Sequence, residues 1–519
     1  MVDAELRAAV EDALALDSTT FQNRAREEAE TVLAAVDDGV FDNPQGLVGL
    51  EWEFYAVANR AEAPRWVGAE QAGAPGSLAR MPRRLLEYVG FEKELGLHNA
   101  ELSTSPQPLN GHGLGAQEHE VAARLQTVRD PLAANGLQLV SDGVWTVPPT
   151  GESTREYLGD HVSVDGHRFA TNMSDSPRYH AMSNSEPRPS MSLSVPHATV
   201  ETATVLPESL ITSMQPHYQV PHARDLPTYL RYATRVAGPL LALGANSPLL
   251  PPDCYDDDAA PEAILADGHD EHRVAIFEQV MNAPDAEKVR FPRDVDTVEE
   301  AVHDIVDDPT LVPADLDTGG DRFDDQFAHF RHKHGTYWRW VRPVFGGASR
   351  ETANARVEFR PLPGQPTVAD TIAFQAAFGG LLAGLYATDH PVADLDWETA
   401  RENFYGAAED GLEADLTWIT CEGDRVTDRE AIFADLLDVA ADGLRSRRVS
   451  AADTERYLDP LRARVDAGTT PADWKREEVR ERLDDGEQFT EAVHAAQRAY
   501  VERQAETLFD GSFADWLDE

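Results

Sequence analysis

A short segment near the N-terminus does most to limit the folds open to this chain. The sequence LVGLEWEFYAV, residues 47–57, alternates as a strand with one buried face does. Glu51 and Glu53 stand two positions apart and therefore point to one face of that strand, whereas Trp52 between them points to the other. The apolar face must pack in a core, so the two carboxylates face either solvent or a lined cavity.

Because the whole chain is acidic, two neighbouring glutamates are weak evidence for a functional site. The 519 residues include 92 Asp and Glu against 45 Lys and Arg, a net charge of −47, so a glutamate pair is often only a solvated face. The hydrophobic share of 42% is ordinary and excludes an acidic disordered chain. Such a surface is typical of proteins from extreme halophiles, where salt screens charge repulsion. It disfavours nucleic acid as a partner, because phosphate binding needs clustered Lys and Arg.

The remaining compositional signals predict a soluble, cytoplasmic protein. Cys254 and Cys421 are too few for a disulfide framework or a four-thiolate zinc site. The N-terminal residues are acidic and amphipathic and lack the apolar stretch of a signal peptide. Residues 371–388 carry no charge over about one bilayer's length. Because Gln375 and a Gly-Gly pair lie within this stretch, we expect a buried core helix and no membrane partner.

The hydrophobic pattern predicts an α+β fold, an antiparallel sheet with helices packed on it and a helical C-terminal region. Helical periodicity covers residues 1–40, 118–135, 226–243 and most of the chain after 388. Strand-like segments occur at 47–57, 95–104, 137–147, 191–196, 211–220, 335–347 and within 354–370. Residues 149–190 are expected to be loop, and residues 250–325, dominated by Asp and Pro, a long surface excursion.

Three further fragments place residues that bind metals or phosphates near predicted strands. Glu94 and Glu101 flank a helix-to-strand turn, His217 lies in mid-strand, and Glu358 and Arg360 share one strand face. Each has an ordinary explanation, since a mid-strand histidine is usually a hydrogen-bonded core residue and a Glu–Arg pair a surface pair. Walker A, strand-linked GxGxxG and HExxH patterns do not occur in the sequence.

Taken in order, these fragments resemble the glutamate–cysteine ligase family, in its carboxylate–amine ligase branch. The residues that carry the resemblance are Gly49-Leu50-Glu51-Trp52-Glu53-Phe54, the Glu94/Glu101 spacing, His217 with Ala245-Asn246-Ser247-Pro248, Val341-Arg342-Pro343, and Glu358-Phe359-Arg360 with Gln365-Pro366-Thr367. Residues 178–182 (Arg-Tyr-His-Ala-Met) are similar to a short element of plant-like and actinobacterial relatives, to which we assign no role. The resemblance covers residues 47 to about 415.

The resemblance implies a curved antiparallel sheet related to that of glutamine synthetase. It divides the chain into an N-terminal helical extension (1–45), a catalytic core (46–400) and a helical C-terminal region (401–519). It also implies a site in which two or three Mg²⁺ or Mn²⁺ ions are held by Glu51, Glu53, Glu94, Glu101, His217 and Glu358. Arg360 would lie on the ATP phosphates, and Arg342 would bind a substrate carboxylate or the acyl phosphate.

The implied reaction joins glutamate to an amine with ATP through an acyl phosphate, and cysteine is the expected amine. Alternatives remain open at this point: a ligase for another amine, and a non-catalytic or regulatory relative that binds a nucleotide or amino acid. A histidine-based metal site at His332 and His334, whose spacing fits a strand, competes with a surface loop there. The sequence does not decide between a monomer and a homo-oligomer.

Overall fold

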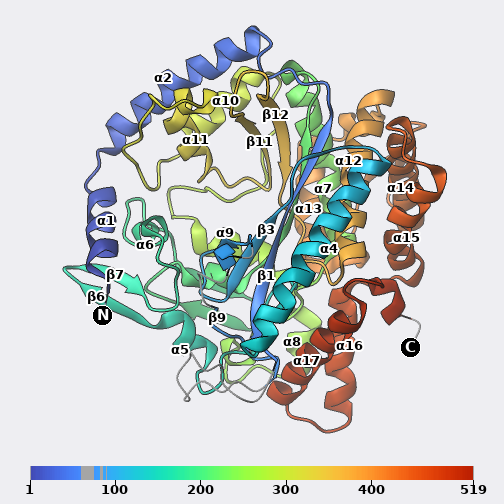
Figure 1. Cartoon of the computed structure of the whole chain (residues 1–519). Coiled ribbons are helices and arrows are strands. Elements are labelled where there is room, and N and C mark those ends of the chain that lie inside the picture. The colour runs from blue at the N-terminus through green and yellow to red at the C-terminus, as the bar shows by residue number, and fades with distance from the viewer. Residues whose placement is uncertain (1, 60–74, 82–85, 89, 518–519) are drawn as a thin grey trace.

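The computed structural model describes residues 2–59, 75–81, 86–88 and 90–517, and one curled antiparallel sheet organises it (Figure 1). The strand order is β11-β12-β10-β1-β3-β2, with β4 and β5 also paired to β1. The strands are β1 (Leu47–Ala58), β2 (Glu92–Lys93), β3 (Asn99–Ser103), β4 (Gln107–Pro108), β5 (Leu137–Val140), β10 (Met214–Gln219), β11 (Val341–Gly346) and β12 (Asn354–Phe359). The predicted α+β class is therefore confirmed.

Helices cover the convex face of the sheet in two layers (Figure 1). The inner layer consists of α4 (Gly111–Ala134), α7 (Leu226–Gly244) and α12 (Val368–Thr388). The outer layer consists of α13 (Trp397–Asp410), α14 (Arg429–Ser446) and α15 (Ala451–Ala467), with a small hairpin of β13 (Trp418–Ile419) and β14 (Arg425–Val426). Helix α12 is long and apolar enough to cross a membrane, but 94% of its most apolar window is buried inside the protein, as expected of a core helix.

The last two helices, α16 (Pro471–Asp484) and α17 (Phe489–Thr507), return to the sheet. Lys475 of α16 forms a buried ion pair with Asp142, just after β5. Gln504 of α17 accepts a hydrogen bond from the Ser141 main-chain N–H (3.1 Å) and donates one to its carbonyl (2.7 Å). The C-terminal helices therefore hold the turn that follows β5, and with it one end of β1.

The N-terminal region contains two helices where one continuous helical region was expected. Helix α1 (Ala4–Leu14) ends before Asp17, whose carboxylate accepts hydrogen bonds from the N–H groups of Thr19 and Thr20 and so starts α2 (Ser18–Asp37). Helix α2 packs on α10 (Val298–Asp307) and α11 (Ala328–His334).

Two segments expected to be irregular are structured, and those expectations were wrong. The supposed surface excursion 250–325 contains α8 (Pro261–Asp267), α9 (His272–Met281) and α10, and buries side chains such as Phe277, Val302 and Ile305. The supposed loop 149–190 contains α5 (Thr154–Gly159), β6 (His161–Val164), β7 (His167–Ala170) and α6 (Pro177–Met182). Helix α10 does have helical periodicity, with Val298, Val302 and Ile305 on one buried face, but it is only ten residues long and lies within an Asp- and Pro-rich stretch that is typical of loops.

Smaller differences concern strand ends. Of the strand pair expected over 137–147, only β5 forms, and residues 141–147 are buried irregular chain joined to Ile211 by one bridge at Val144. The strand expected at 191–196 is half of a hairpin, β8 (Ser192–Val195) and β9 (Ala198–Glu201). Short 3-10 turns complete the concave side, among them η2 (Leu206–Leu210).

Candidate active site

Strand register brings the predicted residues of distant segments onto the concave face of the sheet. His217 on β10 lies opposite Glu358 on β12, and Glu358 lies opposite Arg342 on β11. On the other side of β10, strand β1 presents Glu51, two positions from Gly49, the partner of His217. Trp52 points to the convex side, where its Nε1 donates to Ser141 Oγ at 2.7 Å. Strand β1 therefore has one apolar face and one face that carries carboxylates, as the sequence predicted.

Glu51, His217 and Glu358, here called the His217 cluster, form a compact set of ligand atoms. One atom from each residue lies within 4.8 Å of the other two, and His217 Nε2 is 3.5 Å from Glu51 Oε1. His217 Nε2 is buried and has no hydrogen-bond partner among the described residues. Two carboxylates and an unpartnered imidazole nitrogen suit a divalent cation, so this donor set fits the Mg²⁺ or Mn²⁺ that the family resemblance implies.

The other ring nitrogen of His217 contacts an arginine. Arg356 Nε donates to His217 Nδ1 at 3.3 Å, which makes Nδ1 an acceptor and leaves the ring proton on Nε2. A cation bound to Nε2 requires the opposite tautomer, with the proton on Nδ1. The Arg356 contact and a cation at Nε2 therefore require different tautomers of the His217 ring, so they exclude each other.

Two arginines hold Glu358 in its ionised form. Arg342 Nη2 and Arg360 Nη1 each lie 2.7 Å from the same Glu358 oxygen, and all three side chains are largely buried. Burial by itself would raise the pKa of Glu358, but the charges of Arg342 and Arg360 hold it well below its usual range. Arg360 Nη1 also donates to Gln215 Oε1 at 2.8 Å, so this guanidinium is fixed by two partners.

A second set of carboxylates, Glu53, Glu94 and Glu101, here called the Glu101 cluster, continues along the face. Glu53 lies directly opposite Glu101 on β3. Burial and the charge of Glu94 raise the pKa of Glu53 to about 7, and burial with the charges of Glu51 and Glu94 raises that of Glu101 well above normal. The carboxylates repel one another in a half-buried site, so the cluster also fits a cation.

The two clusters are joined through one side chain that the sequence analysis did not select. Gln215 Oε1 accepts from Arg360, while its Nε2 donates to Glu53 Oε1 at 3.3 Å. Glu53 Oε2 in turn accepts from the Ser213 main-chain N–H at 2.7 Å. The structure therefore brings together all eight predicted residues, with Arg360 between the clusters.

The His217 cluster opens into a cavity of about 570 Å³. Four arginines line it, Arg322, Arg331, Arg342 and Arg356, although the chain has only 45 Lys and Arg in 519 residues. Asp324 holds two of them, with Oδ1 2.8 Å from Arg322 Nε and 3.0 Å from Arg331 Nη1. A cavity with this lining suits a polyanion accompanied by a cation.

Three further side chains reach the site without having been assigned to it. Tyr179 donates to Glu94 Oε2 at 3.4 Å, and its short Arg-Tyr sequence element was the one available signal. Arg273 donates to the main-chain carbonyl of Arg360 at 2.7 Å and lies in the segment expected to be a surface excursion. Glu208 lies on η2, where burial and the charges of Glu94 and Glu53 raise its pKa to about 8. The sequence contains no pattern that distinguishes it from the many other glutamates.

The alternative histidine site does not form. His332 and His334 lie on helix α11, not on a strand or loop. His332 Nε2 bonds to the Val312 carbonyl at 2.9 Å and His334 Nε2 to the Pro343 carbonyl at 2.8 Å. A nitrogen that faces a carbonyl oxygen must carry a proton and cannot bind a metal at that atom.

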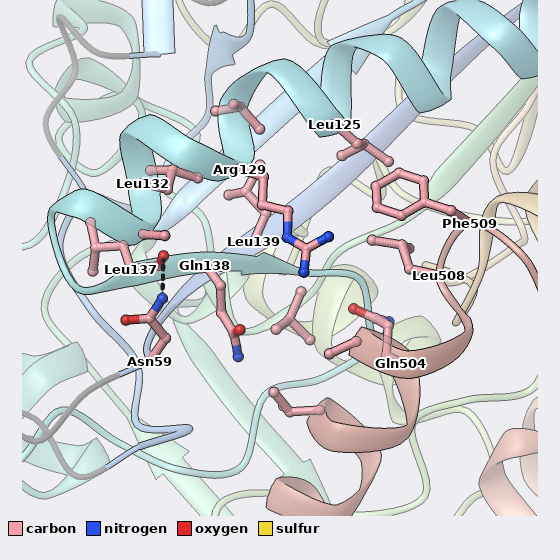
Figure 2. Close-up of a pocket in the computed structure, with 15 residues that line it drawn as sticks. Asn59, Leu125, Arg129, Leu132, Leu137, Gln138, Leu139, Gln504, Leu508 and Phe509 are labelled. Atoms are coloured by element: carbon pink, nitrogen blue, oxygen red, sulfur yellow. Dashed lines mark hydrogen bonds between the residues drawn. The ribbon is translucent and has the colours of Figure 1, made fainter.

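A second cavity, of about 230 Å³, lies on the opposite side of the sheet between α4, β5 and α17 (Figure 2). Its walls are mostly leucine and valine side chains, with Phe509, and Gln504 forms part of its inner wall. Arg129 of α4 reaches into the space between β5 and Leu508 and, as far as the structure is described, is the single charged side chain in the lining. We call it the back cavity, and it lacks the clustered charges of the first.

Comparison with known proteins shows which family the chain belongs to. The sequence matches the model of glutamate–cysteine ligase family 2 (GCS2) over residues 47–504. No curated protein sequence matches it. The AMP-bound glutamate–cysteine ligase of Francisella tularensis is similar in structure, with a TM-score of 0.49 and 12% identity over 92% of each chain. A bifunctional glutathione synthetase from Pasteurella multocida is similar with a TM-score of 0.48 and 13% identity over 92% of this chain and 55% of that one.

A more distant similarity is to the ligase PafA in its complex with the prokaryotic ubiquitin-like protein Pup, with a TM-score of 0.38 and 11% identity over 88% of this chain and 72% of that one. The family match extends from the first strand of the sheet to the last long helix. The chain therefore belongs to glutamate–cysteine ligase family 2 and is a carboxylate–amine ligase.

Proposed function

We propose that this ligase uses ATP to join the γ-carboxylate of glutamate to an amine, with cysteine as the expected amine and γ-glutamylcysteine as the product. The observation that carries the proposal is the position of Arg360 between the two clusters, held by Glu358 on one side and by Gln215 on the other. A guanidinium between two cation-binding clusters suits a transferring phosphoryl group, whose charge needs stabilisation from several directions.

In the proposed reaction, a γ-carboxylate oxygen of glutamate attacks the γ-phosphorus of ATP and ADP leaves. The amine nitrogen then attacks the carbonyl carbon of the acyl phosphate, inorganic phosphate leaves and the amine loses a proton. The His217 cluster and the Glu101 cluster would each hold Mg²⁺ or Mn²⁺, which supplies positive charge against the phosphate oxygens. All eight proposed site residues lie within residues 46–400, the proposed catalytic core.

The arginine-lined cavity supports placing the triphosphate beside the His217 cluster. Arg342 and Arg360 neutralise Glu358, and a cation at Glu358 would take over that role. The two guanidinium groups would then be released to bind phosphate oxygens or a substrate carboxylate. Cation and anion are therefore expected to bind together and to strengthen each other's binding.

The test is ADP release by the purified protein in multimolar KCl with Mg²⁺ and ATP, with glutamate alone and then with a panel of amines that includes cysteine. Turnover that requires both glutamate and cysteine supports the full proposal. Turnover with another amine keeps the ligase and replaces cysteine. If the folded protein turns over no pair while Glu51→Gln gives the same background, the proposal is wrong, and a relative that only binds nucleotide or amino acid takes its place.

A further inference from the structure

Helix α2 lies outside the part of the chain that matches the family, yet it contacts one wall of the arginine-lined cavity. The match begins at residue 47, whereas α2 spans Ser18–Asp37. Helix α2 lies along α10 and α11 (Figure 1). Helix α11 contributes Arg331 and His334 to the lining of the cavity. The N-terminal extension therefore contacts the site through α11.

Glu28 of α2 binds the first turn of α11. Its Oε2 accepts hydrogen bonds from the main-chain N–H groups of His329 at 2.7 Å and Phe330 at 3.0 Å, and its Oε1 accepts one from His329 Nδ1 at 2.7 Å. The N–H groups of a first turn have no partner within their own helix, and negative charge is favourable there. The Glu28 side chain is only 12% exposed and that of His329 only 2%. Glu28 therefore fixes the start of α11 with three partly desolvated, charge-assisted hydrogen bonds.

Two further side chains of α2 hold the rest of α11. Gln22 Oε1 accepts a hydrogen bond from Lys333 Nζ at 2.6 Å, and Lys333 is buried. The ring of Phe21 packs against the rings of His329 and His332, with 5.6 Å between the ring centroids in each pair. Helix α11 has only seven residues, and so short a helix is not stable by itself. Its position therefore depends on these contacts with α2.

The other end of α11 contacts the arginines of the cavity. The carbonyl of His334, the last residue of α11, accepts a hydrogen bond from Arg342 Nη1 at 3.1 Å. Arg342 Nη2 lies 2.7 Å from Glu358 Oε1 in the His217 cluster. Arg331 lies on α11 itself, with its Nη1 3.0 Å from Asp324 Oδ1. A shift of α11 would therefore displace two of the four arginines that line the cavity.

We propose that Glu28 is a positioning residue that acts through α11 to place Arg331 and Arg342 for binding the phosphates of ATP. The inference rests on the proposed function, in which this cavity holds the triphosphate. The N-terminal extension then forms part of the ligase site, although it lies outside the family match. A helix that only stabilised the fold would leave the affinity for ATP unchanged in every variant that is folded.

The experiment compares wild type with Glu28→Gln and Glu28→Asp, and with Glu27→Gln as a matched control at an exposed glutamate of the same helix. Calorimetry at fixed salt and well below Tm gives Kd for the non-hydrolysable ATP analogue AMP-PNP with Mg²⁺, and KM for ATP and Tm are measured alongside. In Glu28→Gln, Kd for AMP-PNP and KM for ATP are expected to rise about tenfold, because α11 loses its charge-assisted hydrogen bonds and the two arginines are displaced. Glu28→Asp should recover part of this loss, and Glu27→Gln should bind like wild type.

A second variant, Gln22→Met, removes the contact with Lys333 and leaves Glu28 in place. Its Kd for AMP-PNP should rise in the same direction by a smaller factor, and it carries the test if Glu28→Gln does not fold. A lower Tm with unchanged Kd and KM for ATP in the folded variants would overturn the inference, because α2 would then only stabilise the fold.

The same measurements separate this inference from the proposed function. A wild-type protein that binds AMP-PNP but turns over no glutamate and amine contradicts the proposed reaction, while the Kd values of the variants still decide the role of Glu28. A folded wild-type protein that does not bind AMP-PNP with Mg²⁺ would overturn the inference together with the placement of the triphosphate.

Discussion

The two cavities lie on opposite sides of the same sheet and differ in almost every property that matters for chemistry. The arginine-lined cavity, here called the front cavity, places four arginines around the His217 cluster. The back cavity is walled mainly by apolar side chains, with Arg129 as its charged member among the described residues (Figure 2). Burying charge costs free energy unless partners compensate for it, and the front cavity is built from such compensations. Because acidic residues occur everywhere on the surface, acidity alone does not identify the site in this protein. The pairing of buried acidic and basic side chains does identify it.

The largest expected effect is the loss of activity on removing a charge from the front cavity. Glu51→Gln and Glu358→Gln should each lower kcat by roughly 1,000-fold or more, because a cation-binding carboxylate disappears without a change in volume. The two variants should differ in stability. Glu358→Gln leaves Arg342 and Arg360 without their shared partner and should cost about 3 kcal/mol, while Glu51→Gln should cost much less.

ADP-release assays and denaturant unfolding at fixed salt measure the two effects separately. Full activity in either variant would remove the assignment of the His217 cluster as a cation site. Equal stability of the two variants would show that the arginine pair does not depend on Glu358.

The next effect concerns Arg360, which is held by Glu358 and Gln215 at once. Both contacts come from Nη1, so the other guanidinium nitrogens are left for a phosphoryl group. A lysine ammonium cannot present the planar set of donors of a guanidinium, so Arg360→Lys should reduce kcat about 100-fold with little change in Tm. The measurement is steady-state kinetics with calorimetric Tm, and Arg129→Lys at the back cavity is the matched control. If Arg360→Lys and its control behave alike, Arg360 is structural.

A substitution in the back cavity should lower stability and leave activity nearly unchanged, which is the opposite of the effect expected for Arg360→Lys. Leu132 is 1% exposed and lines this cavity, so Leu132→Ala enlarges an existing apolar void and should lower the free energy of unfolding by about 2–4 kcal/mol. The kcat/KM of the remaining folded protein should stay within about twofold of wild type. A large loss of kcat/KM at unchanged fold would break the comparison, because it would couple the back cavity to catalysis through Gln504 and Ser141.

The smallest expected effect is a pH dependence confined to the front cavity. Burial and the charge of Arg342 lower the pKa of His334 to about 3, so the folded protein resists protonation that the unfolded chain accepts near pH 6.5. His334 should therefore leave stability unaffected above about pH 6.5 and should lower the free energy of unfolding progressively as the pH drops from 6.5 towards 3.

Unfolding of wild type and His334→Gln across this pH range checks the effect, with His112→Gln as a control at an exposed histidine. The difference between wild type and His334→Gln should shrink as the pH falls. A difference that does not depend on pH would contradict the assigned titration.

The site was predictable from the sequence wherever a residue belonged to a strand with a recognisable pattern. Glu51 and Glu53 stand out because the strand period of two places them on one face, and His217, Glu358 and Arg360 stand out because of their order along the chain. Gln215, Arg273 and Glu208 were missed because their roles come from partners far away in the sequence. The segment 250–325 was misjudged for a related reason, since its short helices are buried by contacts that local composition does not reveal.

The sequence by itself determined the elements and the residue types of the site, because side-chain alternation along a strand and periodicity along a helix are local properties. It thereby determined that Glu51 and Glu53 share one face of β1 and that residues 368–388 form an apolar helix. Only the tertiary structure decided which strands are neighbours, and so which charges meet. Burial and electrostatic coupling depend on distance in space, and it is the pairing of β1, β10, β12 and β11 that converts scattered glutamates and arginines into one site.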